Sequence, residues 1–373
     1  MRSSYLEEDV TLLLKDITGL VQPRPTEERE RLIQAGKHYC EMLPIEYVPS
    51  SQYMEVYREA LRHYAAPTAR AVAVLADKVL EKKGKEVVLV SLVRAGVPVG
   101  ILLKRYLRCR YGIEAAHYGI SIIRGRGIDK NAMNYLLERY APERLLFVDG
   151  WIGKGAILGE LKKDLGEFEG VSADIAVLAD PARVTELCGT HEDILIPSSC
   201  LNCTVSGLIS RTFLRDDIIG EKDFHGAVYY GELEDSDLSY EFIHAIEKEF
   251  GIKKEFGIKK AFGTEIEEEL GSKRRIRTDA EENSFIDSGV DEVKEIAGRF
   301  GIGDINLVKP GIGETTRVLL RRVPWKVLVD EKHEKDAALA HIIRLAEEKQ
   351  VPVERYPLRH YRACGLIKKM ADA

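Results

Sequence analysis

The sequence predicts an α/β protein built around a parallel sheet. From residue 87 onward, short apolar runs alternate with segments whose apolar residues recur at helical spacing. Strands are expected at 87–90, 115–123, 144–148, 175–179 and 193–196, and helices at 100–111, 129–140 and 157–164. Alternation of this kind places helices on both faces of a parallel sheet. Ligands of such sheets usually bind at the carboxyl ends of the strands.

Composition is that of an ordinary globular protein with room for two or three domains. The 373 residues are 45% hydrophobic and 31% charged, and the net charge is −6. This balance argues against adsorption of the whole protein on nucleic acid or on an anionic membrane. No apolar run approaches the ~20 residues of a membrane span, and the acidic start does not resemble a signal peptide. Six scattered cysteines are typical of reduced thiols, so we expect a cytoplasmic protein.

Four regions follow one another along the chain. Residues 1–85 read as a helical extension with helices at 9–20, 26–35 and 51–83, the last one interrupted near Pro67. The sheet domain covers 86–230. A helical connector is expected at 231–288, where a six-residue segment is duplicated at 249–260 and a basic cluster lies at 273–277.

A second, small α/β domain is expected at 289–373. The pattern predicts helices at 290–300, 314–322 and 336–349, and strands at 326–329 and 351–356. Residues 291–373 contain 16 lysines and arginines against 13 acids, a net charge of +3. The sign of that charge suits an anionic partner for this domain.

The segment after the strand at 144–148 has features of a phosphate site. Asp149 ends the strand, and Gly153, Lys154, Gly155 and Ala156 form a turn that opens a helix. Unpaired N–H groups at a helix N-terminus favour an anion, and glycine lets the backbone approach it. Asp149 can bind ribose hydroxyls or, indirectly, a hydrated Mg²⁺. The alternative is an ordinary turn that binds nothing.

Three further loops carry candidate ligand contacts. Arg94, with Ala95 and Gly96, can grip a diphosphate after the strand at 87–90. Arg124 and Arg126 lie on a glycine-flexible loop that can close over a phosphorylated substrate. For both loops the alternative is a surface turn without a ligand.

The third loop, at 197–212, is dense in hydroxyl groups and includes Ser206 and Arg211. It can open a helix as an anion-binding loop or line an acceptor pocket. In the alternative interpretation, Thr204 or Ser206 only caps a helix.

Together these loops resemble the phosphoribosyltransferase fold over about 86–230. The resemblance implies that Arg94, Ala95 and Gly96 bind diphosphate, that 124–127 closes the site, and that 149–156 holds the ribose 5-phosphate of phosphoribosyl diphosphate or a related nucleotide with Mg²⁺. If transfer occurs, a nucleobase-like nitrogen attacks C1 of the ribose and Mg-diphosphate leaves, with Arg94, Arg124 and Arg126 stabilising the departing charge.

The phosphate motif departs from the family pattern at two places. Gly150 stands where the family usually has a second acid, and Gly153 with Lys154 replaces hydroxyl residues. Lys154 can supply a charged phosphate contact instead. The residues therefore predict phosphate binding more directly than transfer, and a non-catalytic nucleotide or RNA sensor is the alternative function.

Segments 4–14 and 34–44 extend the likeness to the whole chain. They resemble predicted phosphoribosyltransferases of tellurite-resistance and stress operons, some of which are labelled cysteine protease StiP family. A thiol peptidase, the third function considered, needs a cysteine with a histidine and an orienting group. Cys40 with His38, and Cys200 with His191 or His225, are the available pairs. Neighbours two residues apart do not face each other on a helix, so we expect structural cysteines.

The tail resembles the Pelota-type RNA-binding domain that the same group carries. The turn Gly-Ile-Gly-Glu-Thr-Thr-Arg at 311–317 matches a turn that opens an RNA-gripping helix in that superfamily, with Gly313 in place of an asparagine. The likeness implies RNA contacts through bases or phosphates. The residues concerned are Lys309, Gly311, Gly313, Glu314, Thr316, Arg317 and Arg321. The alternative is a capped helix on a protein-binding copy of the fold.

Overall fold

The computed structural model describes residues 1–251, 288–321, 323–333 and 336–368. The basic cluster at 273–277, Arg322 and all but the first three residues of the duplication at 249–260 lie outside these ranges. Within them, no helix is both long enough and apolar enough to cross a membrane.

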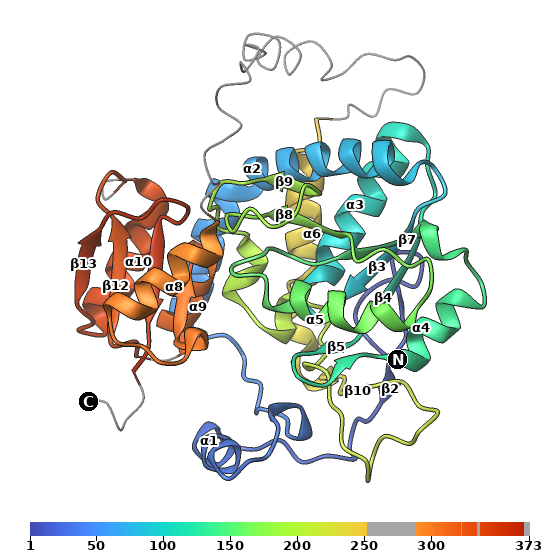
Figure 1. The fold of residues 1–373 in the computed structure, drawn as a ribbon, viewed down its shortest axis with the longest axis horizontal. Helices are drawn as coiled ribbons and strands as arrows, with labels where there is room; N and C mark the ends of the chain where they lie inside the picture. The colour runs from blue at the N-terminus through green and yellow to red at the C-terminus, as the bar shows by residue number, and fades with distance from the viewer. Residues whose placement is uncertain (252–287, 322, 334–335, 369–373) are drawn as a thin grey trace.

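A six-stranded parallel sheet forms the centre of the protein, as Figure 1 shows. In spatial order its strands are β1 (Thr11–Leu12), β4 (Ala116–Ile120), β3 (Val88–Leu92), β7 (Leu145–Val148), β8 (Ile175–Ala179) and β9 (Cys188–Thr190). β3, β7 and β8 are buried along their whole length, which explains their continuous apolar sequences. The α/β class with a parallel sheet is therefore confirmed.

Helices cover both faces of the sheet. One face packs against α2 (Ser51–Lys83), α3 (Gly96–Tyr111) and α6 (Ser239–Lys248), and the other against α4 (Lys130–Leu137) and α5 (Ala156–Asp164). The strand order reverses between β3 and β7, because the chain continues from β3 to β4 on one side and returns to β7 on the other. A reversal of this kind opens a crevice at the carboxyl ends of the two strands.

The helix expected at 9–20 is wrong. This segment instead forms β1, which extends the sheet beside β4, and β2 (Lys15–Asp16), which pairs with β10 (Gly226–Ala227). Leu12, Leu13 and Leu14 are all buried against the domain. Apolar residues in so short a segment fit both the helical and the strand repeat. The open edge of the sheet supplies backbone hydrogen-bond partners, and the segment therefore forms a strand.

Four other expectations also change. α2 continues through Pro67 without a break, and β9 at 188–190 replaces the strand expected at 193–196. The loop at 197–212 contains only the short 3₁₀ turns η4 (Pro197–Cys200) and η5 (Cys203–Val205), so no α-helix opens there. α6 belongs to the first domain, because it packs against α2 and α3.

Smaller elements complete the first domain. They are α1 (Thr26–Gln34), η1 (Tyr39–Glu41), β5 (Ile122–Ile123), β6 (Gly127–Ile128), η2 (Pro142–Arg144), η3 (Leu165–Glu167) and η6 (Gly231–Ser236). β5 and β6 form an antiparallel hairpin around the loop that carries the two predicted substrate arginines.

The C-terminal residues form a small mixed α/β domain. Its sheet has the order β11 (Val308–Pro310), β14 (Ala363–Leu366), β12 (Lys326–Asp330) and β13 (Val353–Tyr356). Its helical elements are α8 (Gly289–Arg299), η7 (Ile305–Leu307), α9 (Ile312–Arg321), η8 (Ala337–Leu339) and α10 (Ala340–Glu348). β14 pairs antiparallel with β11 and β12, whereas β12 and β13 are parallel.

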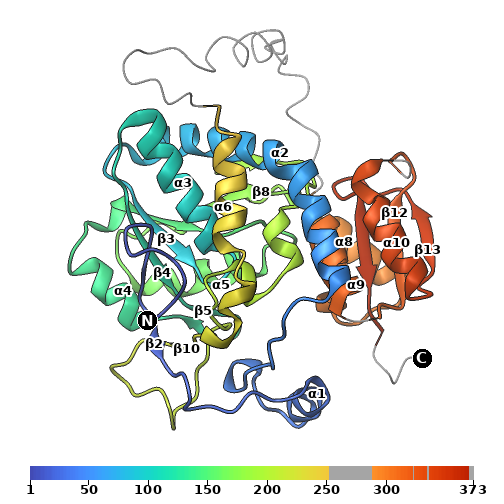
Figure 2. The same ribbon diagram turned by 180° about the vertical axis from the view of Figure 1, so that it is seen from behind.

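This domain lies against α2, as Figure 2 shows, and shares a hydrophobic core with the first domain. Leu319 and Ile342 belong to the same buried cluster as Leu75 of α2. The Tyr53 hydroxyl donates to the Leu320 carbonyl oxygen at 2.6 Å. The two domains are therefore joined by packing as well as by polar contacts.

Candidate ligand site

The loops after β3 and β7 touch at the reversal of the strand order. A Cβ atom on Gly96 would stand 2.2 Å from the carbonyl oxygen of Val148 and 3.1 Å from Cα of Asp149. A Cβ on Gly150 would stand 3.4 Å from Ala95. Glycine at 96 is therefore required for the two loops to meet, which brings Arg94–Gly96 and Asp149 into one crevice.

Asp149 is the acid at this crevice. Its carboxylate is partly buried and accepts a hydrogen bond from the Gly150 N–H at 2.7 Å. In the described part of the chain it forms no ion pair. Burial raises its pKa to about 6, opposed by the Gly150 N–H and by the charge of Arg317. An acid in this state is available to ribose hydroxyls or to a hydrated cation.

Arg94 is bound by a residue that sequence reasoning missed. Its Nη1 lies 3.1 Å from Oε1 of Glu46 and 3.2 Å from the Ile209 carbonyl oxygen. Glu46 belongs to the segment between η1 and α2, and its side chain is only 4% exposed. No local motif marks Glu46, since its role depends on how the N-terminal segment folds over the sheet.

Ser206 and Arg211 also bond within the protein. The Ser206 hydroxyl donates to the Asn202 carbonyl oxygen at 2.8 Å. Arg211 Nη2 donates to the carbonyl oxygens of Tyr39 and Met42 at 2.7 and 3.0 Å. Arg211 therefore ties the loop at 197–212 to the N-terminal segment.

Lys154 reaches across to the C-terminal domain. Its Nζ donates to the carbonyl oxygens of Ile305 and Val308 at 2.8 and 3.1 Å. Burial and then the charge of Lys309 lower its pKa to about 8. Gly155, at φ +75°, provides the left-handed turn that starts α5 at Ala156. The predicted phosphate loop thus lies at the boundary between the domains.

Arg124 and Arg126 lie on the exposed loop between the buried strands β5 and β6. Arg124 Nη1 donates to Oδ1 of Asn306 at 3.0 Å, and Arg126 forms an ion pair with Glu41 at 3.0 Å. The Gly125 N–H donates to Oε2 of Glu160 at 2.9 Å. The two arginines are therefore held by different neighbours rather than placed together over the crevice.

The turn predicted to bind RNA packs against the first domain. Gly311, Gly313 and Thr316 are buried, and the Asp193 carboxylate accepts N–H groups from Ile312 and Arg362, each at 2.9 Å. Between the domains lies a cavity of about 10 Å³, the size of one water molecule. Its lining includes Trp151, Gly153, Asp193, Ser199, Gly311 and Gly313.

Of the other predicted RNA contacts, Arg317 is held near the crevice. Its Nη1 lies 3.3 Å from Oε1 of Glu314, and its guanidinium lies 5.6 Å from the centre of the Trp151 ring. Arg321 donates to the side-chain oxygen of Asn202. The Lys309 carbonyl oxygen accepts from the Thr315 hydroxyl at 3.2 Å.

Comparison with known proteins decides the family. The model described as "Tellurite-like stress resistance cysteine protease StiP" matches residues 3–247. A protein of Acinetobacter baylyi (strain ATCC 33305 / BD413 / ADP1) named "Cysteine protease StiP" is 35% identical over 380 residues, covering 98% of this chain and 94% of that protein. The chain belongs to the StiP family. The model "PELOTA RNA binding domain" matches residues 287–369 of this StiP-family chain.

Two solved structures align with part of the chain. Helicobacter pylori xanthine-guanine-hypoxanthine phosphoribosyltransferase is 19% identical with a TM-score of 0.23, covering 31% of this chain and 72% of that one. A hypothetical protein from Neisseria gonorrhoeae with bound ppGpp is 16% identical with a TM-score of 0.21, covering 36% and 70%.

One expectation about the cysteines is wrong, namely that His38 and Cys40 do not face each other. Cys40 and His38 do face each other, with Sγ 2.9 Å from Nδ1. They can do so because His38 caps the 3₁₀ turn η1 instead of lying inside a helix. Burial raises the pKa of Cys40 to about 11, and burial with the Arg126 charge lowers that of His38. At neutral pH the pair is a neutral thiol beside a neutral imidazole.

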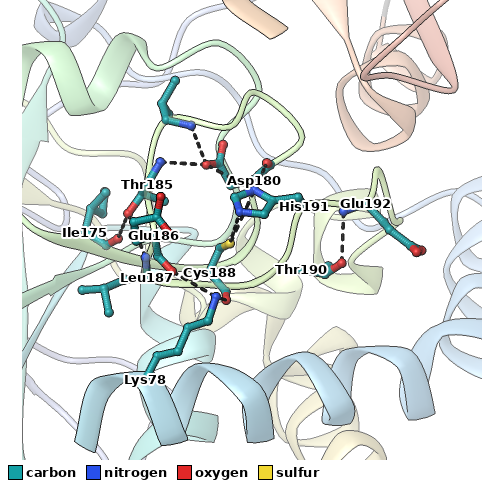
Figure 3. A network of polar contacts seen from close by, with 11 residues as sticks. Lys78, Ile175, Asp180, Thr185, Glu186, Leu187, Cys188, Thr190, His191 and Glu192 are labelled. Carbon is teal, nitrogen blue, oxygen red and sulfur yellow. Dashed lines mark hydrogen bonds and ion pairs between the residues drawn. The ribbon is translucent and has the colours of Figure 1, made fainter. Parts of the chain in front are cut away.

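A second cysteine–histidine contact was missed altogether. Figure 3 shows Cys188 beside the ring of His191. Cys188 Sγ lies 3.4 Å from Nε2 of His191, whose Nδ1 is 2.9 Å from the Asp180 carbonyl oxygen. The Asp180 carboxylate accepts N–H groups from Val184 and Thr185 at 2.7 and 2.8 Å. The three-residue spacing of Cys188 and His191 was the available signal.

Neither of the two histidines considered as partners of Cys200 is recorded in contact with it. His191 contacts Cys188 instead, and Nδ1 of His225 lies 2.8 Å from the Ser121 hydroxyl. Burial raises the pKa of Cys188 to about 11, and its side chain has no exposed surface. Among the described residues, no three His, Cys, Asp or Glu side chains gather in a way that would hold a metal ion.

Proposed function

We propose that this chain is a cytoplasmic phosphoribosyltransferase-like protein of a stress or tellurite-resistance response. It binds phosphoribosyl diphosphate, or a nucleotide with the same ribose phosphate group, and its C-terminal domain binds RNA. The observation that carries the proposal is the contact between Gly96 and Val148, which joins the Arg94–Gly96 loop to Asp149 where the strand order reverses.

Each loop has a separate role in this proposal. The N–H groups at the start of α5, with Lys154, bind the 5-phosphate. Asp149 accepts hydrogen bonds from the ribose hydroxyls, and Arg94 binds the diphosphate. Phosphate competes with the carbonyl oxygens of Ile305 and Val308 for Lys154, and diphosphate competes with Glu46 for Arg94.

Mg²⁺ fits this site as a companion of the ligand. One carboxylate, Asp149, offers hard oxygen donors at the crevice, and Mg²⁺ is commonly held by one or two carboxylates plus substrate phosphates. Asp149 would be the residue that holds the ion, and the ion would supply positive charge that neutralises the diphosphate.

Group transfer is a further step beyond binding. In transfer, an acceptor nitrogen forms a bond to C1 of the ribose while the bond to diphosphate breaks, and Arg94 stabilises the leaving charge. Arg124 and Arg126 would assist only if the hairpin moved from its contacts with Asn306 and Glu41. Gly150 packs on Ala95 and supplies no second acid, which specifically favours a sensor that binds without turnover.

Calorimetry with phosphoribosyl diphosphate and Mg²⁺ tests the proposal, followed by diphosphate release with a panel of nucleobases and RNA. We expect binding that falls in Asp149→Asn and Lys154→Met and is unchanged in Asp235→Asn, a change at an exposed carboxylate. Absence of binding to the wild-type chain would reject the proposal. Binding without diphosphate release would favour the sensor.

A cysteine peptidase is the second candidate. The name of the Acinetobacter relative and the contact of Cys188 with His191 favour it. In this mechanism the Cys188 thiol passes its proton to Nε2 of His191, and the Asp180 carbonyl oxygen orients the ring. Cleavage of a casein or peptide substrate that is abolished by Cys188→Ser, but not by Cys109→Ser, would establish it.

A further inference from the structure

Helix α9 brings two arginines of the C-terminal domain to the crevice. Arg317 stacks over Trp151, which lies two residues beyond Asp149 in the phosphate loop. Its charge is close enough to lower the pKa of Asp149 against the effect of burial. One turn further along α9, Arg321 bonds to Asn202 in the loop that also contains Ser206. Both arginines therefore reach the first domain.

Arg321 is the arginine of this group that forms no ion pair with an acid in the described part of the chain. Desolvation lowers the pKa of Arg321, and the like charges of Arg317 and Arg94 lower it further. Glu46 is paired with Arg94 and Glu314 with Arg317, whereas Arg321 donates to the neutral amide of Asn202. A guanidinium without an acidic partner can bind an anion through charge-assisted hydrogen bonds.

The cavity beneath α9 contains a second sign of a missing polar partner. Ser199 lines it, is 4% exposed, and has a buried hydroxyl without a hydrogen-bond partner. A Cβ atom placed on Gly313, in the first turn of α9, would stand 3.6 Å from this hydroxyl oxygen. The boundary between the domains is therefore polar and incompletely paired.

We infer that the anion is bound between the two domains, with Arg317 and Arg321 of α9 joining Arg94 around the diphosphate of a phosphoribosyl ligand. The inference rests on the proposed function and deepens it, because it makes the C-terminal domain part of the small-molecule site. Arg317 and Arg321 then serve this site while the C-terminal domain packs against the first domain. In this arrangement Gly311, Gly313 and Thr316 are buried.

The test uses the full chain with Trp325→Phe, which leaves Trp151 as the only tryptophan. Mg-phosphoribosyl diphosphate is titrated while Trp151 emission is followed, because that ring lies under Arg317. We expect Arg317→Gln and Arg321→Gln each to weaken binding about tenfold or more, and Arg317→Lys to recover part of the loss. Arg344→Gln is the matched control. Arg344 lies on α10 and also joins the two domains, through an ion pair with Glu59 at 3.1 Å.

The outcomes separate this inference from the proposed function. Binding lost in Asp149→Asn but unchanged in both glutamine variants would overturn the inference and leave the proposed function standing. No emission change and no heat of binding for the parent chain would overturn both. Thermal unfolding of each variant identifies a folding defect, and the Arg317→Lys and Arg321→Lys chains then replace the glutamine variants. If those lysine variants and the parent bind diphosphate with equal affinity at both high and low salt, the inference is also overturned.

Discussion

Gly96 lies so close to Val148 that a Cβ at position 96 would stand 2.2 Å from the Val148 carbonyl oxygen. Gly96 begins helix α3 and Val148 ends the buried strand β7, so the backbone atoms concerned cannot move aside easily. This contact fixes the distance between the Arg94 loop and Asp149, and the stability and the ligand affinity of the protein therefore depend on it together.

Gly96→Ala should destabilise the protein by about 1–3 kcal/mol, because the methyl group overpacks the junction. Urea denaturation measures the change. The control is Gly159→Ala within α5, where a Cβ meets nothing within 4 Å and alanine should be neutral or stabilising by up to about 1 kcal/mol. Equal stability of the two variants would contradict the role assigned to Gly96.

Asp149→Asn should stabilise the free protein at pH 8 by on the order of 1–2 kcal/mol. The folded pKa of about 6 exceeds the ordinary value of 3.8, so folding favours the protonated acid. That contribution is complete below pH 4 and is lost as the pH rises through 6. The difference between variant and wild type should therefore shrink toward pH 4, whereas Asp235→Asn should show no such trend. A pH-independent difference would refute the burial of Asp149.

Asp193→Ala should loosen the C-terminal domain by about 2–4 kcal/mol, because two N–H groups lose a charged partner. Hydrogen exchange in α9 and β14 should accelerate. Glu192→Ala is the control, since Glu192 is 71% exposed and lies 3.8 Å from Arg362, and its effect should stay within about 0.5 kcal/mol. Unchanged exchange in α9 would show that other contacts hold the domains.

RNA affinity should rise about tenfold in the same Asp193→Ala variant, because the turn at 311–317 is then uncovered. Fluorescence anisotropy with labelled stem–loop and single-stranded RNA measures the affinity, and its decrease with added salt reports phosphate contacts. Weaker RNA binding by Asp193→Ala would place the RNA surface elsewhere on the protein.

Alkylation should modify Cys109 well before the other five cysteines at pH 7.5. Cys109 is exposed, whereas the others are buried, and burial raises the pKa of Cys40 and Cys188 to about 11. Mass spectrometry after short treatment with iodoacetamide gives the order, and treatment in urea should remove it. Faster reaction of Cys188 than of Cys109 would instead support the peptidase candidate.

Local sequence patterns predicted an element correctly where the residues of that element alone determine its structure. The continuous apolar runs of β3, β7 and β8 predict buried parallel strands, because such strands are covered on both faces. The same patterns failed at 9–20, where the choice between helix and strand depends on an open sheet edge far away in the sequence. Pro67 likewise did not end α2, since packing on the sheet outweighs the local cost.

The sequence by itself determined the α/β class, the loops at the strand ends and the residue types that suit a phosphate. Each of these depends on neighbours within a few positions along the chain. Only the tertiary structure decided what those residues contact: Glu46 on Arg94, the carbonyl oxygens of Ile305 and Val308 on Lys154, and Arg317 over Trp151. These partners lie 48 to 166 positions apart, and no local pattern encodes a contact that arises only when separate elements pack together.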